Sequence, residues 1–514
     1  MNKSQSDLHS TLFSSLGIYT EYVLGMVVSI LIARHLQPAG FGSYSVVIWM
    51  VALGVTFTNS GTSTAAIRFV AELRGGQQPG LIAPLLAYLR RAQMMFLAVV
   101  LVLGMIALVF AGQHVAPGMD HGWLAAFLVV TISVRALYMF NIGIAKGFQN
   151  FRGTAVIAMA SAPLTLLMVA IATWLDAPLS VFLGIFVASG LMLLLMSQLQ
   201  TRAWVPASEP GTVLPPELLA RVKRHMRLTA MTVTLGFLVG SEIEVLFLKL
   251  YASEDSAGQF KVAYQLAIGA ALLVPGVFGA ILLPMMASAL KQGVEVAAQR
   301  FVASTRYLTL LASPLIAFGV VFCVPIINVM YGSAYAPAAP VFAACLVGGS
   351  LMTMTQGGSS LLVSADRQGS ILTMVSIMAV LKIVLDIFLI IKYGLQGAIY
   401  AYLVVSLLYT VTVMVLAIRA SGASPQWHLL ARVGMAAAAG GAAAWPLLGH
   451  APPLISIVSG GMLICAVYLP LTLLLNCWSR GDIDYMRALH GRLGSRRIRL
   501  VDRLLERAQR RAQA

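Results

Sequence analysis

Residues 92–111, AQMMFLAVVLVLGMIALVFA, form a run of twenty residues without a charged side chain. As a helix rising about 1.5 Å per residue, this run spans the roughly 30 Å hydrocarbon core of a bilayer. The rest of the chain is similar, because 59% of its 514 residues are hydrophobic and only 10% are charged. Soluble domains carry roughly 25% charged residues. The sequence therefore predicts an all-α integral membrane protein.

A scan of the whole chain for such runs predicts fourteen transmembrane helices. Those in the first half span 12–33, 44–61, 92–111, 123–145, 154–174 and 179–199. Those in the second half span 229–250, 260–286, 307–330, 340–363, 371–391 and 397–418, and two more cover 432–449 and 454–476. The first run is long and is not followed by a small-residue cleavage site, so we interpret it as a membrane helix rather than a signal peptide. The four cysteines are scattered singly, without zinc or redox spacing, and we expect no disulfide.

The basic residues support this count and orient the chain. With the N-terminus in the cytoplasm, the inner segments carry 28 of the 34 Lys and Arg residues, and the outer segments and their borders carry 4. Cytoplasmic loops carry an excess of Lys and Arg, and a miscounted helix would scramble every later loop. We therefore predict that both termini are cytoplasmic.

The chain also looks duplicated. The first helix ends in IARHL (32–36) and GFGSY (40–44) follows, while the seventh ends in FLKLY (247–251) and SAGQF (256–260) follows. Each helix end carries a cation, and a Gly-x-aromatic step comes after it. Six helices per repeat is an even number, so the two bundles share one orientation and are related by a pseudo-two-fold axis along the membrane normal.

This repeat predicts the domain organisation. The predicted parts are a first six-helix bundle (1–200), a proline-containing cytoplasmic linker (201–228), a second six-helix bundle (229–418), two extra transmembrane helices (432–476) and a basic cytoplasmic tail (477–514).

No catalytic constellation stands out in the sequence. It contains no HExxH, no Walker A loop and no GxSxG in a strand–turn setting. The histidines fall in loops, at helix ends or in the N-terminal tail, which is typical of interfacial positions. We therefore predict a transporter rather than an enzyme, with no catalytic residue, no metal site and no cofactor.

Ionisable side chains deep in the predicted spans are the informative residues, because each costs a few kcal/mol in a bilayer and normally faces a cavity or a partner. They are Glu21, Arg135, Glu242, Glu244, Lys382 and Asp386. Lys382 and Asp386 are four residues apart on one helical face, so they either neutralise each other or line a cavity. On a continuous helix Glu242 and Glu244 point about 200° apart, so we expect at most one of them in a cavity.

Arg135 is the strongest candidate for binding substrate. No charged residue lies within four positions of it, so its partner must come from another helix, water or substrate. Tyr138 and Asn141 follow at helical spacing and complete a polar stripe. Arginine grips phosphate, and the other two can bond or stack on sugars. The stripe fits a phosphate beside sugar hydroxyls, or a hydrated packing face. Arg34, at the outer end of the first helix, either binds substrate or snorkels to headgroups.

The net charge of +16 lies in the loops and the tail. For a soluble protein this would suggest nucleic acid, but here anionic lipid is the better partner, and we expect no nucleic acid. Residues 499–511, RLVDRLLERAQRR, can form an amphipathic helix on the inner leaflet, either as a lipid-binding element or as a topogenic anchor.

Residues 31–44, LIARHLQPAGFGSY, resemble the polysaccharide export flippases of the multidrug/oligosaccharidyl-lipid/polysaccharide exporter superfamily. Members typically show ARxLGPxGFGxY at this place, and Gln37 here replaces the usual glycine. Residues 61–73, GTSTAAIRFVAEL, and 248–266, LKLYASEDSAGQFKVAYQL, also look like the family. These motifs mark structure rather than substrate, and the resemblance extends to about residue 476.

The resemblance implies a flippase that moves undecaprenyl-diphosphate-linked oligosaccharide repeat units across a bacterial inner membrane by alternating access, for exopolysaccharide or O-antigen export. It assigns anion binding to Arg135 and Lys382, and it makes Glu21, Glu242, Glu244 and Asp386 candidates for proton or sodium coupling. A polysaccharide polymerase and export machinery would be partners. No motif match selects these residues, which rest on their position within the spans.

Three alternatives stay open. The multidrug exporter branch would share the architecture, and a census of two deep cations and four deep anions does not exclude it, but the motif at 31–44 disfavours it. The lipid II flippase branch has an arginine-rich first helix that is not recognisable here. A membrane-embedded glycosyltransferase or polymerase should have a large outer loop with acidic or arginine residues, whereas the longest outer loop, 112–122, has neither Arg nor Lys.

Overall fold

The computed structural model describes the whole chain apart from residues 1–2, 77, 116–118, 206–212, 241, 274–275, 451, 492–505, 507–508 and 510–514. Over the described residues the elements are helices and short 3₁₀ turns, without a strand. The predicted all-α class is therefore confirmed. The four cysteines are free thiols.

The chain forms two compact helical units. The first comprises Met1–Lys261 and Ile390–Leu395, and the second comprises Val262–Leu389 and Gln396–Ala514. The first unit thus includes the helices after the proline-containing linker, which the sequence analysis assigned to the second bundle. The five predicted domain ranges stay a prediction.

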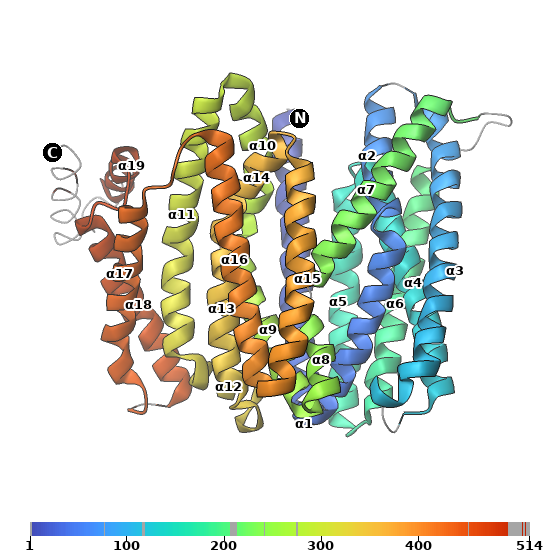
Figure 1. Ribbon diagram of the computed structural model, residues 1–514, viewed down its shortest axis with the longest axis horizontal. Coiled ribbons are helices and arrows are strands. Elements are labelled where there is room, and N and C mark those ends of the chain that lie inside the picture. The colour runs from blue at the N-terminus through green and yellow to red at the C-terminus, as the bar shows by residue number, and fades with distance from the viewer. Residues whose placement is uncertain are drawn as a thin grey trace. The chain divides into compact units, whose positions relative to one another are not determined.

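The first unit is built around α1 and α4 (Figure 1). Helix α1 packs along α5 and α4, and α4 packs along α6 and α2. The elements are α1 (Lys3–Asn59), α2 (Thr62–Gly75), η1 (Pro79–Leu81), α3 (Ile82–Val115), α4 (His121–Gly147), α5 (Phe151–Trp174), α6 (Leu179–Trp204), α7 (Pro216–Gly240), α8 (Ile243–Tyr251) and the start of α9 (Glu254–Leu273).

Helix α1 contains both of the first two predicted spans. Its continuity is interrupted at Gln37, whose φ of 58° and ψ of 173° are not helical. Pro38 follows, and a proline disfavours helical geometry in the residue before it. We expected a loop at 34–43, between the first two spans. In this segment only Gln37 has non-helical dihedral angles, so the chain kinks there instead of forming a loop.

Small residues bring α2 against α4 and so fix the position of α4. A Cβ added to Gly143 would lie 2.9 Å from the carbonyl oxygen of Ser63, and one added to Gly147 would lie 2.8 Å from that of Ala66. Glycine at such crossings lets helix backbones approach closely in membranes. The start of α4 is capped by Asp120, whose side chain accepts a 2.6 Å hydrogen bond from the Trp123 amide.

The second unit is centred on α11, which packs against α10, α13, α14, α17 and α18, while α17 and α18 pack on each other (Figure 1). Its elements are α10 (Gly276–Gln292), α11 (Val294–Val321), α12 (Cys323–Tyr331), η2 (Ser333–Tyr335), α13 (Ala338–Met354), α14 (Gln356–Ser364), most of α15 (Gln368–Tyr393), α16 (Leu395–Ser421), α17 (Trp427–Ala444), η3 (Trp445–Leu447), α18 (Pro453–Leu474) and α19 (Arg480–Gly491).

Among the described residues, ten helices are long and apolar enough to cross a membrane, or eleven if the bent pair α7 and α8 is one span. One of the ten, Tyr19–Asn59, holds both spans of α1. The remaining two predicted spans correspond to the pair α9 and α10, of which α9 ends at Leu273 and α10 begins at Gly276, and to the Ala/Gly-rich α17, which is not among the ten.

The outside of the helices is apolar, as a lipid environment requires. On α3 the side chains of Leu103, Val109 and Phe110 are 60%, 81% and 80% exposed. Water would disfavour so many large apolar groups on one helix. Residues 92–111 therefore form a lipid-facing span.

Candidate functional site

Arg135 lies near the middle of α4 with its guanidinium turned toward α6. Its Nη2 donates to the Phe186 carbonyl oxygen at 3.2 Å and to the Ser189 hydroxyl at 3.1 Å. The guanidinium carbon lies 3.6 Å from the centroid of the Phe186 ring. A cation over an aromatic face is attracted by the ring quadrupole. Helix α6 thus holds the side chain in place through neutral groups.

The positive charge of Arg135 is not neutralised at close range. Among the described residues no carboxylate forms an ion pair with it, and its Nε is buried without a hydrogen-bond partner. A carbonyl, a hydroxyl and a ring can orient a guanidinium, but they cannot cancel its charge. A cation held this way keeps a strong attraction for an anionic ligand.

Two other predicted site residues share the electrostatic environment of Arg135. Glu21 on α1 and Tyr138 on α4 both interact electrostatically with the guanidinium. Glu21 is exposed and Tyr138 is half-buried. The structure therefore brings together Arg135, Tyr138 and Glu21 within the first unit.

Asn141 does not join this group through its amide nitrogen. Its side chain is 3% exposed, and Nδ2 donates a 3.0 Å hydrogen bond to the Ser197 hydroxyl of α6. A nearby residue that the sequence analysis did not select is Gln93 on α3, which is fully buried. Its Nε2 lies 2.9 Å from both Asn59 Oδ1 and the Ala136 carbonyl oxygen. The one amide inside the apolar run 92–111 was the available signal.

The two repeated Gly-x-aromatic steps cross each other in the first unit. A Cβ on Gly42 would overlap the Glu254 carbonyl oxygen and lie 3.0 Å from the Gly258 nitrogen. A Cβ on Gly258 would overlap the Pro38 carbonyl oxygen. The repeat was noticed in the sequence, but its self-contact was not, because sequence similarity does not specify a contact.

A polar cluster links the two segments at this crossing. Lys249 forms an ion pair with Glu254 and donates a 2.9 Å hydrogen bond to the Ser43 hydroxyl, which donates to Glu254 Oε2 at 2.9 Å. Lys249 is 9% exposed. Arg34, by contrast, is exposed on α1.

The two predicted carboxylates of the seventh span are separated by a break in the helix. Helix α7 ends at Gly240, α8 begins at Ile243, and the two are bent by 53°. The helical-wheel comparison of Glu242 and Glu244 assumed a continuous helix, so its angle does not apply. Glu242 forms an ion pair with Lys261 of α9, and Glu244 is fully buried.

The remaining two predicted residues lie in the second unit, one turn apart on α15. Lys382 is 1% exposed and Asp386 is fully buried. The Lys382 Nζ lies 5.7 Å from the centroid of the Tyr402 ring, which packs edge-on against Tyr264. Both charges are therefore inside the unit. As to metals, the described residues contain no group of three or more His, Cys, Asp or Glu side chains that could hold an ion.

The model of a family described as polysaccharide biosynthesis protein matches residues 8–290, which is more than half of the chain. No curated protein sequence matches the chain significantly.

Solved structures resemble the fold. The inward closed conformation of the lipid II flippase MurJ aligns with a TM-score of 0.71 at 12% identity, covering 90% of this chain and 98% of that chain. An inward-facing multidrug resistance MATE transporter of the MOP superfamily aligns with a TM-score of 0.59 at 13% identity, covering 78% and 93%. A mutant of the Vibrio cholerae MATE transporter VcmN aligns with a TM-score of 0.55 at 14% identity, covering 80% and 95%.

At such identities the likeness concerns the fold, while the family model concerns the sequence. Together they agree with the resemblance noted at residues 31–44 and with a multi-pass membrane protein. The chain therefore belongs to the polysaccharide biosynthesis protein family, and its fold is similar to those of the lipid II flippase MurJ and of MATE transporters.

Proposed function

We propose that this protein flips undecaprenyl-diphosphate-linked oligosaccharide repeat units across the bacterial inner membrane by alternating access, for exopolysaccharide or O-antigen export. The observation that carries the proposal is Arg135, a cation inside a membrane span that is held by a carbonyl oxygen, a hydroxyl and an aromatic ring, all of them neutral. A guanidinium binds phosphate oxygens through paired N–H donors, and its buried Nε still has a donor to offer. The diphosphate is the part of the substrate that needs such a group.

The neighbours of Arg135 suit the rest of that ligand. Tyr138 offers a hydroxyl and a ring to the first sugar. Glu21 lies in the same electrostatic environment and would compete with the diphosphate for the guanidinium. In this scheme a proton or a sodium ion on Glu21 removes that competition, so ion binding and substrate binding favour each other. Lys382, in the second unit, stays a proposed anion-binding residue.

The other carboxylates have different capacities for coupling. Glu242 is paired with Lys261, so protonation of Glu242 would free that lysine. Glu244 and Asp386 are fully buried, where a change of charge has a large effect. Both termini would face the cytoplasm, where the basic tail contacts anionic lipid. A polymerase and export machinery would consume the flipped product.

The experiment that tests this function measures the sidedness of lipid-linked oligosaccharide in the inner membrane after deletion of the gene. We expect repeat units to accumulate on the cytoplasmic face. Unchanged sidedness would refute the flippase proposal.

The matched variants are Arg135→Ala and Arg91→Ala, the second at an exposed position on α3. Hydrogen bonds to charged groups contribute about 1.5–3 kcal/mol, so loss of Arg135 should slow export at least about tenfold at equal protein level. Arg91→Ala should export normally. Arg135→Lys keeps the charge and should restore part of the rate.

A multidrug exporter is the second candidate, favoured by the exposed carboxylate of Glu21 on α1. Such a transporter would extrude organic cations. The deletion strain should then become sensitive to cationic dyes while oligosaccharide sidedness stays normal, which is the opposite outcome to that of the flippase.

A further inference from the structure

A polar pocket of about 570 Å³ opens at one end of the second unit. One wall is the first part of α11, with Glu295, Gln299 and Arg306. The other wall is the segment from the end of α16 to the start of α17, with Ser421, Ser424 and Gln426 among its residues. The volume lies within the range of about 300–1,000 Å³ typical of small-molecule sites. None of these residues belongs to the proposed transport site.

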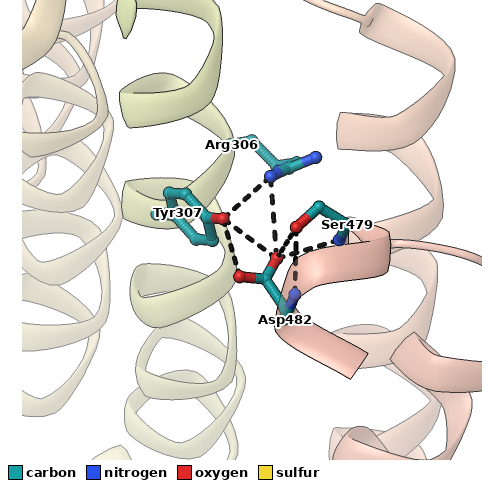
Figure 2. Close-up of polar contacts among 4 residues, drawn as sticks. All are labelled: Arg306, Tyr307, Ser479 and Asp482. Carbon is teal, nitrogen blue, oxygen red and sulfur yellow. Dashed lines mark hydrogen bonds and ion pairs between the residues drawn. The ribbon is translucent and has the colours of Figure 1, made fainter. Parts of the chain in front are cut away.

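Arg306 is the only cation of this wall, and its donors are only partly used. Nη2 donates to the Tyr307 hydroxyl at 3.0 Å and lies 3.7 Å from Asp482 Oδ2. Figure 2 shows Asp482 between Tyr307 and the Ser479 end of α19, where it forms a long ion pair with the guanidinium and no direct hydrogen bond to it. Among the described residues the buried Nε has no hydrogen-bond partner. The guanidinium therefore retains donors that a second anion can take.

Asp482 does not take those donors because other groups already hold it. The Tyr307 hydroxyl lies 2.9 Å from both of its carboxylate oxygens, and the Ser479 amide donates to Oδ2 at 2.9 Å (Figure 2). Burial raises the pKa of Asp482, but these hydrogen bonds and the Arg306 charge outweigh it, so the pKa lies below its usual range. The carboxylate stays ionised and stays in place.

The opposite wall also favours an anion. Helix α17 has eighteen residues, and its N-cap Gln426, which lines the pocket, makes no side-chain capping bond. The first amide groups of a helix lack intrahelical partners and carry a partial positive charge. Gln299 and Ser424 add neutral hydrogen-bonding groups. Arg306 and the start of α17 therefore face one pocket with complementary means of holding a phosphate.

The residues beside the pocket are typical of the membrane interface. Trp427 follows Gln426 directly and is 55% exposed, and Val294 at the start of α11 is 54% exposed. Exposed tryptophan beside the end of a span is typical of the membrane interface. A phosphate at this depth belongs to a membrane lipid. Glu295 at the α11 wall would repel additional negative charge, which favours headgroups with a single phosphate.

We propose that this pocket is a binding site for the phosphate headgroup of a membrane phospholipid, held by Arg306 and the start of α17. The site is distinct from the transport site and would be occupied whether or not the protein flips oligosaccharide.

The test uses the purified full chain and native mass spectrometry with phosphatidylglycerol as the probe lipid. Wild type should retain one more tightly bound lipid than Ala303→Trp, which fills the pocket while keeping the arginine in the chain. Arg306→Gln should weaken that lipid at least about tenfold, which corresponds to 1.4 kcal/mol. Asp482→Asn keeps Arg306 and removes the carboxylate charge that is paired with it, so it should bind lipid at least as well as wild type.

Three results would overturn the proposal. The first is equal lipid retention by wild type and both pocket variants, and the second is loss of lipid only in Asp482→Asn. The third is complete displacement of the lipid by millimolar inorganic phosphate, which would assign the pocket to a free anion. A thermal melt of each variant confirms that it is folded, and the two pocket variants give independent readings.

Discussion

Replacing Gly258 by alanine should destabilise the protein markedly, because its backbone touches that of α1. The new Cβ would overlap the Pro38 carbonyl oxygen and lie 3.0 Å from the Gly42 nitrogen, whereas unstrained contacts begin near 3.4 Å. Both neighbours are backbone atoms and cannot rotate away. The start of α9 must therefore move from α1, which pulls Glu254 away from Ser43 and disturbs the buried Lys249.

The cost can be estimated from its two parts. Overpacking a close contact costs about 1–3 kcal/mol. Weakening the partners of a buried charge adds a share of the roughly 3–5 kcal/mol lost when such a pair is broken. Alanine recovers about 1 kcal/mol over glycine in a helix. The net destabilisation should be about 3 kcal/mol.

The matched control is Gly104→Ala on α3, where a Cβ would meet nothing within 4 Å. That change should leave stability unchanged or raise it by about 1 kcal/mol. Thermal unfolding of the two variants in the same detergent, followed by intrinsic fluorescence, compares them directly. Equal midpoints would refute the close contact between the two repeated motifs.

Three further predictions address other parts of the structure. Gln93→Leu should destabilise the first unit by about 1–3 kcal/mol, because it leaves Asn59 Oδ1 and the Ala136 carbonyl without their donor, and a denaturation midpoint equal to wild type would contradict this. Lys382→Met should lower the free energy of unfolding by about 3–5 kcal/mol, because Asp386 stays buried beside it, and Lys382→Met with Asp386→Leu should recover much of that loss. A double variant no more stable than the single variant would show that the two charges are not coupled. The pKa of Asp482 is lowered in the folded state, so the carboxylate stabilises α19 fully above the unfolded pKa of about 4, and this stabilisation is lost as the pH falls through the folded pKa. Limited proteolysis of α19 should therefore be faster in Asp482→Asn than in wild type at pH 7, and the two rates should be equal only at strongly acidic pH.

Much of the architecture was accessible from hydropathy and charge. The apolar runs identified the spans because a bilayer leaves a chain few options besides helices. Breaks within helices were harder. The chain has only a kink at Gln37, where we expected a loop between two spans, and the bend between Gly240 and Ile243 lies inside a run that looked continuous. Hydropathy averages over about twenty residues and does not register a single non-helical one.

The grouping of side chains was predicted only in part. Tyr138 joins Arg135 because helical spacing determines neighbours on one helix, and Glu21 lies near enough to interact. Asn141 instead donates a hydrogen bond to Ser197, because its partner depends on which helix packs beside α4. The partners of Glu242 and Lys249 come from α9, and the sequence does not specify how the chain turns between α8 and α9.

The helices of the basic tail were predicted less well than the membrane spans. The amphipathic helix predicted at 499–511 lies almost wholly outside the described residues, while α19 at Arg480–Gly491 was not predicted. Its start is a reciprocal cap between Ser479 and Asp482, a signal readable in SRGD (479–482). The basic composition of the region drew attention to lipid instead, and Tyr307 lies too far along the chain to be recognised as its partner.

In the proposed function, Arg135 binds the diphosphate of a lipid-linked oligosaccharide that this protein moves across the membrane. The most direct measurement places the purified chain in liposomes with undecaprenyl-diphosphate oligosaccharide and follows its exposure to a membrane-impermeant glycosidase. Wild type and Arg91→Ala should expose the pool initially in the inner leaflet, and Arg135→Ala should do so at least about tenfold more slowly. Equal rates for Arg135→Ala and wild type would contradict the role of Arg135, and no exposure beyond protein-free liposomes would contradict the flippase itself.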